Sequence, residues 1–500
     1  MVLYCGTCRH IAVTNGSINQ IHKNNKRRAY RMSTQHSDSD YLIVGSGAVG
    51  MAFADTLLSE TDASIIIVDR FHKPGGHWNC AYPFVTLHQP SSFYGVNSRE
   101  LSKGKKDHVG LNKGLNELAT GAEVSAYFDD VMREQFLPSG RVKYFPMCDY
   151  TGEGNFTSRL TGQEHHVKVN KKTIDATYLN TTVPSTHTPN FKVDRGVQFM
   201  PLNDLTKITS PPAGYVVVGG GKTGIDAIIF LLEKQVNPDN ITWIMSRDAW
   251  LIDRKNTQAS EEFFIDSIGN EANQMEAIAS STSVDDMFHR LENSGVLLRI
   301  DTNIWPSMFH GATVSTMELA QLRRVKNIVR LGRVTHIHSD KIVLVKGEIA
   351  TSSKHIHVDC SASAITNLNI KPIFEENLIT PQTVRSYQPV FSAAFIAHVE
   401  ASYPNDEIKN KICNVVPLPN TTNDWVRVTA AFMMNQHIWG QDQELRAWLL
   451  QNRLDGFSKL VRNVQEHETD KIEILKRLKG ASPAAMAKLQ AYLAQIHGQR

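Results

Sequence analysis

The sequence lacks three features, and each absence excludes a class of protein. It has no uninterrupted apolar run near the ~18 residues of a membrane-spanning helix, which excludes an integral membrane protein. Its six cysteines in 500 residues show no framework spacing and are typical of free thiols in a reducing compartment. Its 20 histidines are scattered, without an H-E-x-x-H motif or a Cys/His cluster of ligand spacing, so we expect no metal site.

Excess positive charge is also lacking outside the N-terminal segment. The net charge is +3, and residues 1–37 contribute +6 without any acidic residue, which leaves −3 (+3 minus +6) on the rest of the chain. A slightly acidic body argues against nucleic acid as the main partner. The composition, 41% hydrophobic and 21% charged, is typical of a soluble globular protein. At ~150 residues per domain, the length suggests two to four domains.

Residues 1–37 have no hydrophobic periodicity, and we expect a disordered leader there. Because the segment contains arginine and no acid, a mitochondrial presequence is one interpretation. The other is an upstream start codon, since translation from Met32 would leave only a short leader. We therefore expect a cytoplasmic protein, or a mitochondrial one if the segment is a presequence.

The clearest signal is a βαβ unit over Tyr41–Arg70, in which a G-x-G-x-x-G turn joins an apolar run to a helical pattern. The first glycine makes the tight turn, the second lets the backbone approach a pyrophosphate, and the third allows close helix–strand packing. The helix N-terminus offers free N–H groups to the phosphates. Asp69 lies 19 residues after the last glycine, where an acid suits the hydroxyls of an adenosine ribose. The predicted dinucleotide-binding residues are Gly45, Ser46, Gly47, Val49, Gly50, Asp69 and Arg70.

The segment after Asp69 is rich in groups that suit a ligand site. A Gly-Gly pair lets the backbone approach a ligand, and Trp78 can cover a ring system. The loop over residues 81–96 is dense in aromatic and polar side chains, so we expect it to line a cavity, with ordinary packing as the alternative for each side chain. Gly76, His77 and Trp78 are further cofactor-binding candidates, and the catalytic candidates are His77, Tyr82 and His88.

Tyr215–Asp226 repeats the strand, glycine turn and helix. The second strand of this unit ends in Ser246-Arg247 instead of an acid. A cation and a hydroxyl suit a ribose 2′-phosphate, which an aspartate would repel, and Arg254 is a candidate for a second charge. The alternative is an ordinary surface arginine. The predicted binding residues are Gly219, Gly221, Lys222, Thr223, Gly224, Ser246 and Arg247.

Each half of the chain runs from a glycine turn through helices and a β-meander to an apolar strand that ends in Asp175 or Asp359, which indicates an internal duplication. We predict an α/β protein with two Rossmann-type domains and a helical C-terminal region, whose last helical pair breaks at Gly480–Pro483. The predicted segments are 1–37 (leader), 38–210 and 355–435 (first domain), 211–354 (second domain) and 436–500 (helical region).

Two such motifs 174 residues apart resemble those of flavoproteins with two dinucleotide-binding domains, above all the flavin-containing and Baeyer–Villiger-type monooxygenases. The resemblance covers residues 40–400 and includes the Gly-Gly-x-Trp at 75–78. It implies FAD at the first motif and NADPH at the second. The family's F-x-G-x-x-x-H-x-x-x-[FY] signature is absent, because residues 191–205 stand in its place, and the Ala-Thr-Gly strand ends are replaced at 175–178 and 359–362.

The resemblance implies an FAD- and NADPH-dependent oxidoreductase, monooxygenase-like, that acts on a small organic substrate. Two alternatives stay open: a flavin-dependent reductase or dehydrogenase without a stable oxygen adduct, and a non-catalytic nucleotide-binding redox sensor. The expected partner is a small molecule, and neither nucleic acid nor a membrane is expected.

Overall fold

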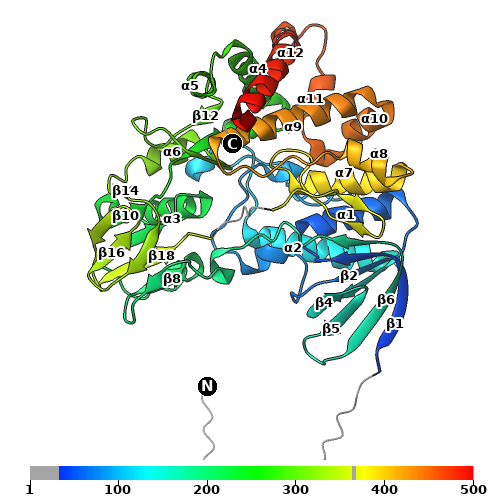
Figure 1. Cartoon of the computed structure of the whole chain (residues 1–500), viewed down its shortest axis with the longest axis horizontal. Helices are drawn as coiled ribbons and strands as arrows, with labels where there is room; N and C mark the ends of the chain where they lie inside the picture. The colour runs from blue at the N-terminus through cyan, green and yellow to red at the C-terminus, as the bar shows by residue number, and fades with distance from the viewer. Residues whose placement is uncertain (1–32, 363–367, 499–500) are drawn as a thin grey trace, which may run out of the picture.

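The computed structural model describes residues 33–362 and 368–498, so the predicted leader lies, up to residue 32, outside the described residues. The first domain is built on a sheet in the order β19-β20-β6-β1-β2-β3, extended by a β4–β5 hairpin (Figure 1). The strands β1, β2, β3, β6 and β20 run parallel, because buried β-branched runs such as Ile65–Val68 are covered on both faces. The strand bounds are β1 Gln35–Val44, β2 Ile65–Val68, β3 Val142–Phe145, β4 Cys148–Gly152, β5 Asn155–Ser158, β6 Glu164–Asp175, β19 Phe374–Glu375 and β20 Leu378–Ile379.

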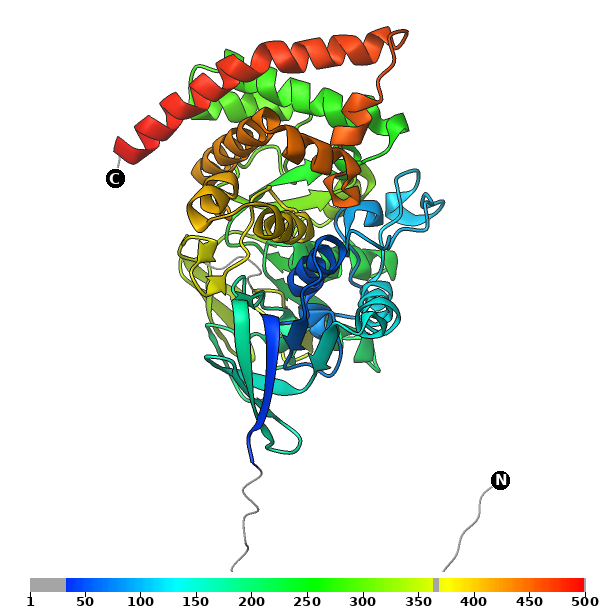
Figure 2. The ribbon, with the colours of Figure 1, turned by 90° about the vertical axis from the view of Figure 1, so that its right-hand side faces the viewer.

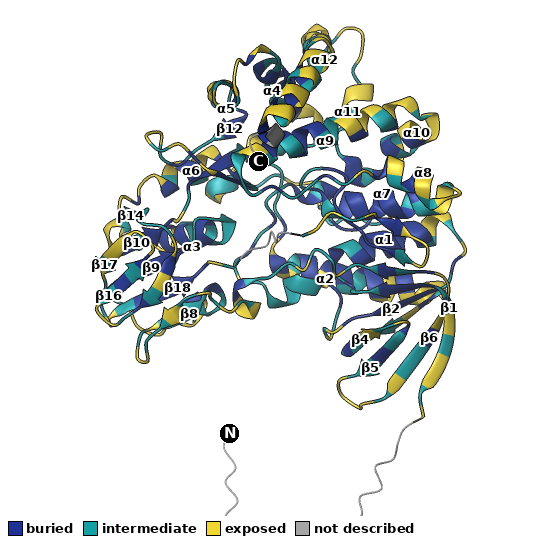
Figure 3. Cartoon of the chain, viewed as in Figure 1, coloured by how far each residue is buried: buried dark blue, intermediate teal, exposed yellow. Residues whose placement is uncertain are grey.

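The helices α1 (Ala48–Glu60), α2 (Gly121–Val131) and α7 (Pro389–Ser402) pack with this sheet in the largest hydrophobic core. Figure 3 shows α1 and α7 as mostly buried, between the sheet and the C-terminal helices. The strand β1 begins at Gln35, so the predicted leader ends too late by a few residues. The reason is that the polar N-terminal half of β1 pairs with β6, and this pairing has no signal in the local hydrophobic pattern.

The second domain is an all-parallel sheet in the order β14-β10-β9-β18-β8, with α3 (Lys222–Glu233) following β9. Because β18 pairs with β9, the predicted domain boundary at residue 355 is displaced: this strand lies in the second sheet and not in the first. The predicted duplication is seen in the registers, which place Val44 opposite Asp175 and Val218 opposite Asp359. The bounds are β8 Phe199–Pro201, β9 Gly214–Val218, β10 Ile241–Ile244, β14 Ile328–Val329 and β18 His355–Asp359.

Two small sheets and a helical layer complete the molecule. The sheet β12-β11-β13 joins the second domain to the helices, and β17-β16-β15-β7 forms its outer edge (Figure 1). The bounds are β7 Lys192–Val193, β11 Ala249–Asp253, β12 Leu297–Leu298, β13 Met308–Val314, β15 Val334–Ile337, β16 Lys341–Leu344, β17 Gly347–Ala350, α4 Phe264–Ser280, α5 Val284–Asn293, α6 Thr316–Leu322, α8 Asp406–Ile412, α9 Thr422–Gln441, α10 Gln443–Gln451, α11 Ser458–Arg462 and α12 Thr469–Gly498. None of the described helices is long and apolar enough to cross a membrane.

The predicted break at Gly480–Pro483 is wrong. Figure 2 shows α12 as one continuous, bent helix, with Pro483 inside it. A proline in a helix interior costs ~3 kcal/mol because it removes a hydrogen bond and crowds the preceding turn. Packing offsets this cost here, since α12 buries Ala485 and Leu489 and pairs Arg477 with Glu276 of α4.

Candidate functional site

The first glycine turn has the geometry of a phosphate cradle. Gly45 has a φ of +99°, which favours glycine, and Gly47 caps α1 without any side-chain hydrogen bond. A Cβ on Gly50 would lie 2.0 Å from the carbonyl oxygen of Gly45, so only glycine permits this approach of helix to strand. The first N–H groups of α1 therefore have no side-chain partner at the carboxyl edge of the sheet.

Asp69 and the Gly75-Gly76 pair hold this turn in place. Asp69 is 5% exposed, and its Oδ2 accepts hydrogen bonds from Ser46 N (2.5 Å) and Ser46 Oγ (2.7 Å). Its Oδ1 accepts from Phe71 N at 2.7 Å and has one lone pair left for a ribose hydroxyl. A Cβ on Gly76 would lie 2.9 Å from the Cα of Gly47, so the pair closes over the turn. Arg70 is exposed, and Val49 is half-buried in α1.

Of the three catalytic candidates, His77 lies nearest to this turn. Its ring is half-buried and stacks on Trp78, with ring centroids 5.3 Å apart. Burial lowers the pKa of His77 to about 4, so the ring is neutral at pH 7. Trp78 is fixed in turn, because its Nε1 donates to Tyr94 Oη at 2.8 Å.

Tyr82 and His88 face the second domain instead. Tyr82 Oη donates to Asp226 Oδ2 of α3 at 2.6 Å, and Phe84 stacks on Phe230 of the same helix with centroids 4.0 Å apart. Burial lowers the pKa of His88 far below its usual value, and the nearby cations Lys222 and Arg254 lower it further. The three candidates therefore do not form one cluster, and half of the loop packs on α3.

The second glycine turn is more open than the first. A Cβ on Gly224 would lie 2.0 Å from the carbonyl oxygen of Gly219, which repeats the packing of the first turn. Gly221 caps α3 without a side-chain bond, and no atom lies within 4 Å of the place where its Cβ would stand. Lys222 forms an ion pair with Asp226 one turn along the helix, and Thr223 is half-buried beside it.

At the end of β10, Ser246 is exposed and Arg247 is half-buried. The guanidinium of Arg247 donates to Asn420 Oδ1 at 2.8 Å, and its pKa is lowered by burial and by the nearby cation of Arg333. Within the described part of the chain, neither arginine pairs with a carboxylate, and two uncompensated cations beside a hydroxyl suit a phosphate. Arg333 and Asn420 were not predicted, since they come from distant segments.

The predicted contribution of Arg254 is wrong. Its side chain is 1% exposed and forms an ion pair with Glu318 at 2.7 Å. The remaining guanidinium nitrogens donate to the carbonyl oxygen of His88 and to Asn112 Oδ1, both at 3.2 Å. A buried guanidinium needs this full set of acceptors, so Arg254 holds the loop to the second domain and is not available to a ligand.

Two cavities are lined by described residues other than those of the glycine turns. One, of about 620 Å³, includes Asn420 (the partner of Arg247) together with Leu179 and Thr383 of the first domain. The other, of about 270 Å³, is bounded by the loop after Trp78, by α4 and by α9. Its wall includes Gln89, Phe93, Glu271, Tyr387 and Trp425.

Tyr387 gives the smaller cavity its most unusual feature. Its φ is +59°, a strained conformation for a tyrosine, and its buried hydroxyl has no hydrogen-bond partner. A Cβ on Gly311 would lie 2.4 Å from the Tyr387 ring, so that glycine makes room for it. Burial raises the pKa of Glu271 in the same wall.

No family model matches the sequence. The chain is 47% identical over 427 residues to the uncharacterised protein Rv2000 of Mycobacterium tuberculosis (strain H37Rv), which covers 85% of this chain and 79% of that protein. Mb2023 of Mycobacterium bovis matches equally well. The chain belongs to the family of these mycobacterial proteins.

Solved structures with a similar fold are more distant. A flavin-containing monooxygenase from Stenotrophomonas maltophilia is 13% identical, over 75% of this chain and 99% of that one, with a TM-score of 0.41. An NADP+-bound cyclohexanone monooxygenase from Rhodococcus sp. Phi1 is 10% identical, over 74% and 84%, with a TM-score of 0.44. Bacillithiol disulfide reductase from Bacillus cereus is 12% identical, over 74% and 100%, with a TM-score of 0.39.

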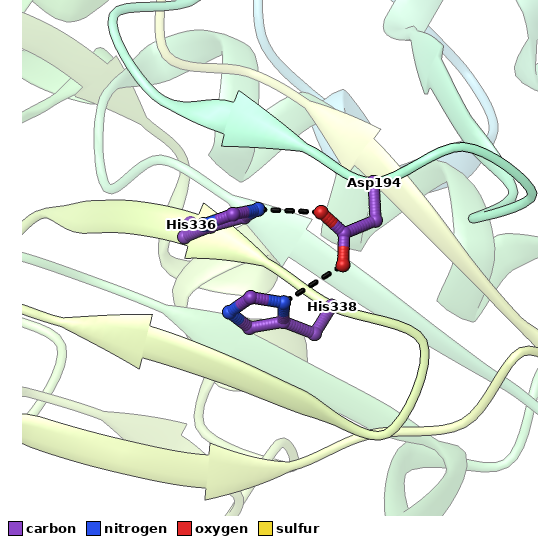
Figure 4. A group of neighbouring side chains, drawn as sticks. All are labelled: Asp194, His336 and His338. Atoms are coloured by element: carbon purple, nitrogen blue, oxygen red, sulfur yellow. Dashed lines mark hydrogen bonds and ion pairs between the residues drawn. The ribbon is translucent and has the colours of Figure 1, made fainter.

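The sequence predicts no metal site, yet the structure brings three possible metal ligands together. Asp194 lies between His336 and His338 at the edge of the second domain (Figure 4). Within residues 33–362 and 368–498, this is the one group of histidine, cysteine and acidic side chains that is close enough to hold an ion. No motif could reveal it, because Asp194 and His336 are 142 residues apart.

Burial of His77 predicts a pH-dependent stability. The folded-state pKa of about 4 lies below the ordinary value of 6.5, so the unfolded state binds more protons between these values and stability falls as pH falls from 6.5 to 4. In full, this pKa shift would change the free energy of unfolding by ~3 kcal/mol. The partial exposure of the ring reduces that contribution to about 2 kcal/mol. Urea unfolding at pH 7.5 and 5.0 should show a smaller loss in His77→Gln than in the native chain, by up to about 2 kcal/mol, while the buried His88 keeps its own contribution in both. The exposed His72→Gln is the matched control, and an equal pH dependence in His77→Gln would contradict the assignment.

Proposed function

We propose that this protein is a monooxygenase-like oxidoreductase that binds FAD at the first glycine turn and NADPH at the second, and that acts on a small organic molecule. The observation that carries the proposal is the repeated turn: each one brings an uncapped helix N-terminus to the carboxyl edge of a parallel sheet. The two turns differ in the charge near the end of the next strand. The first has the acid Asp69 there, and the second has Arg247, with the cation of Arg333 nearby.

At the first turn, the N–H groups of α1 and the backbone of Gly47 and Gly76 would hold a pyrophosphate. Asp69 fixes Ser46 through two hydrogen bonds and presents its Oδ1 to a ribose hydroxyl. A bound flavin would exchange hydride or electrons between a nicotinamide and an acceptor. The chain itself binds and orients, and Trp78 and Tyr94 exclude water on the side of the loop.

At the second turn, the open space over Gly221 leaves room for a pyrophosphate. Lys222 already pairs with Asp226, so a phosphate here would compete for its ammonium group. Arg247 and Arg333 would then take the 2′-phosphate of NADPH, with Ser246 as a neutral donor. Asn420 holds the guanidinium of Arg247 in place and also lines the larger cavity, which extends to the first domain.

For the substrate we propose the smaller cavity, on the evidence of Tyr387 and Glu271. At about 270 Å³ it is slightly below the usual 300–1,000 Å³ of ligand pockets, which favours a molecule smaller than a drug. Burial favours the neutral, hydrogen-bond-donating form of the Glu271 carboxyl, and the Tyr387 hydroxyl is a second donor without an acceptor. Aromatic and aliphatic side chains share the remaining wall with polar ones and with the Arg385–Asp455 ion pair, which suits a ligand with an apolar body and a hydrogen-bond acceptor.

Two other functions are distinguished by the products formed. A reductase or dehydrogenase would oxidise NADPH with an added electron acceptor and incorporate no oxygen from ¹⁸O₂ into an organic product. A nucleotide-binding sensor would bind nicotinamide nucleotide without oxidising it.

The glycine turns give the sharpest test of the cofactor assignment. The purified chain should show a flavin absorbance spectrum, and Gly47→Val should lose it because a side chain would occupy the pyrophosphate path. Gly221→Val should keep the flavin and lose its reduction by NADPH. The space over Gly221 is open in the protein itself, so this variant should melt like the native chain. A full flavin spectrum in Gly47→Val would overturn the assignment of the first turn.

Arg247 should set the choice of nicotinamide. A charge-assisted contact to a phosphate is worth roughly 1.5–3 kcal/mol, or ten- to over a hundredfold in affinity. Arg247→Ala should raise the KM for NADPH by that factor and leave the KM for NADH nearly unchanged, and Arg333→Ala should act in the same direction. Equal losses with both nucleotides would mean that Arg247 supports the fold through Asn420 instead.

Tyr387→Phe should separate ligand binding from cofactor binding. Removing a buried hydroxyl that has no partner should leave the free protein equally stable or up to ~1 kcal/mol more stable, with unchanged flavin content. Acetophenone should bind the native chain roughly fivefold tighter than ethylbenzene, which lacks the carbonyl acceptor, and the variant should lose this difference. Both affinities can be measured by thermal shift. If the difference survives in Tyr387→Phe, the hydroxyl is not the donor.

A further inference from the structure

We propose that Asp194, His336 and His338 form a binding site for a divalent transition-metal ion of the zinc type. The site lies on the sheet β17-β16-β15-β7, at the outer edge of the second domain (Figures 1 and 4). It does not depend on the proposed flavin chemistry, because none of its residues contributes to either glycine turn or to either cavity.

The backbone places the three side chains together. His336 lies in β15 and His338 follows two residues later, so both side chains project from the same face. The strand β7 pairs with β15 in parallel, with Lys192 opposite His336 and Val193 opposite Ile337. Asp194 is the next residue, and its N–H donates to the carbonyl oxygen of Ile337 at 3.0 Å. The register itself therefore brings the carboxylate to the two rings.

The ligand atoms converge. His336 Nε2 lies 2.6 Å from Asp194 Oδ1, and His338 Nδ1 lies 2.8 Å from Asp194 Oδ2. The two rings stack with centroids 3.8 Å apart, and the ligand atoms all lie within 4.8 Å of one another. Figure 4 shows both ring nitrogens directed at the same carboxylate.

In the structure, the two imidazole rings are hydrogen-bonded directly to the carboxylate. Bonds of ~2.1 Å around a tetrahedral zinc ion place ligand atoms about 3.4 Å apart, so the carboxylate would have to move away from the rings by roughly 0.6–0.8 Å. It is free to do so, because the Asp194 side chain is 43% exposed. The hydrogen bonds from His336 and His338 lower the pKa of Asp194, so the ligand is ionised at neutral pH.

The donor set selects the class of metal. Two imidazoles and one carboxylate suit Zn²⁺, Ni²⁺ or Cu²⁺, whereas Mg²⁺ and Ca²⁺ prefer oxygen ligands alone. Three protein ligands leave a fourth position for water, and the half-exposed rings give the ion a path to enter. A bound ion would cross-link β7 to β15 and so fasten the chain where it first enters the second domain.

The test uses the full-length protein after EDTA treatment and dialysis. Isothermal titration with ZnCl₂ should show a site that is weakened at least tenfold by His336→Ala, His338→Ala and Asp194→Asn, and MgCl₂ at the same concentration should not bind there. Asp194→Asn keeps the shape of the side chain, so its metal-free melting temperature should match that of the native chain.

His36→Ala is the matched control, since His36 and His166 form a ring pair with centroids 5.6 Å apart that has no carboxylate between the rings. This variant should bind zinc as the native chain does. The proposal is overturned if the native chain binds no zinc, or if the stoichiometry and affinity are the same in the His336→Ala/His338→Ala double variant as in His36→Ala.

Discussion

Both domains depend on one steric contact, the approach of the third glycine of each motif to the carbonyl oxygen of the first. A Cβ on Gly50 or on Gly224 would lie 2.0 Å from that oxygen, so any side chain would push the helix off the strand end. With hydrogen at these positions, each helix starts beside its strand, and its free N–H groups point past the edge of the sheet. The placing of both proposed nucleotide sites follows from this contact.

The segment that follows β2 links the two turns. Gly76 packs on Gly47 at the first turn, while Tyr82 donates to Asp226 on the helix of the second. Asp226 also forms an ion pair with Lys222, whose ammonium group would contact a phosphate bound at the start of α3. A nucleotide that drew Lys222 away would leave Tyr82 as the remaining donor to Asp226.

The sequence was sufficient for the features that are encoded by neighbouring residues. Glycine spacing, β-branched runs and the residue after each second strand predicted both turns, because a βαβ unit is local. The pairings between distant segments left no such pattern: Asn420 lies 173 residues from Arg247, and Asp194 lies 142 residues from His336. Arg254 shows the opposite error. It lies near the strand end where a phosphate-binding cation is expected, but its side chain is buried and paired with Glu318, which is distant in the sequence.

The smaller cavity shows why the motifs indicate cofactors and not a substrate. A left-handed φ at Tyr387 and its unpaired hydroxyl each destabilise the folded chain by about 1–3 kcal/mol, and Glu271, whose pKa is raised by burial, lies on the same wall. The glycine turns carry no such cost, because they would bind a ligand through backbone groups. The pyrophosphate that they would bind is shared by the cofactors of many enzymes. Costly side chains persist only where the rest of the structure over-determines them. Because these side chains lie together on one wall, we assign the substrate selectivity of the proposed enzyme to them. No general sequence motif describes these residues.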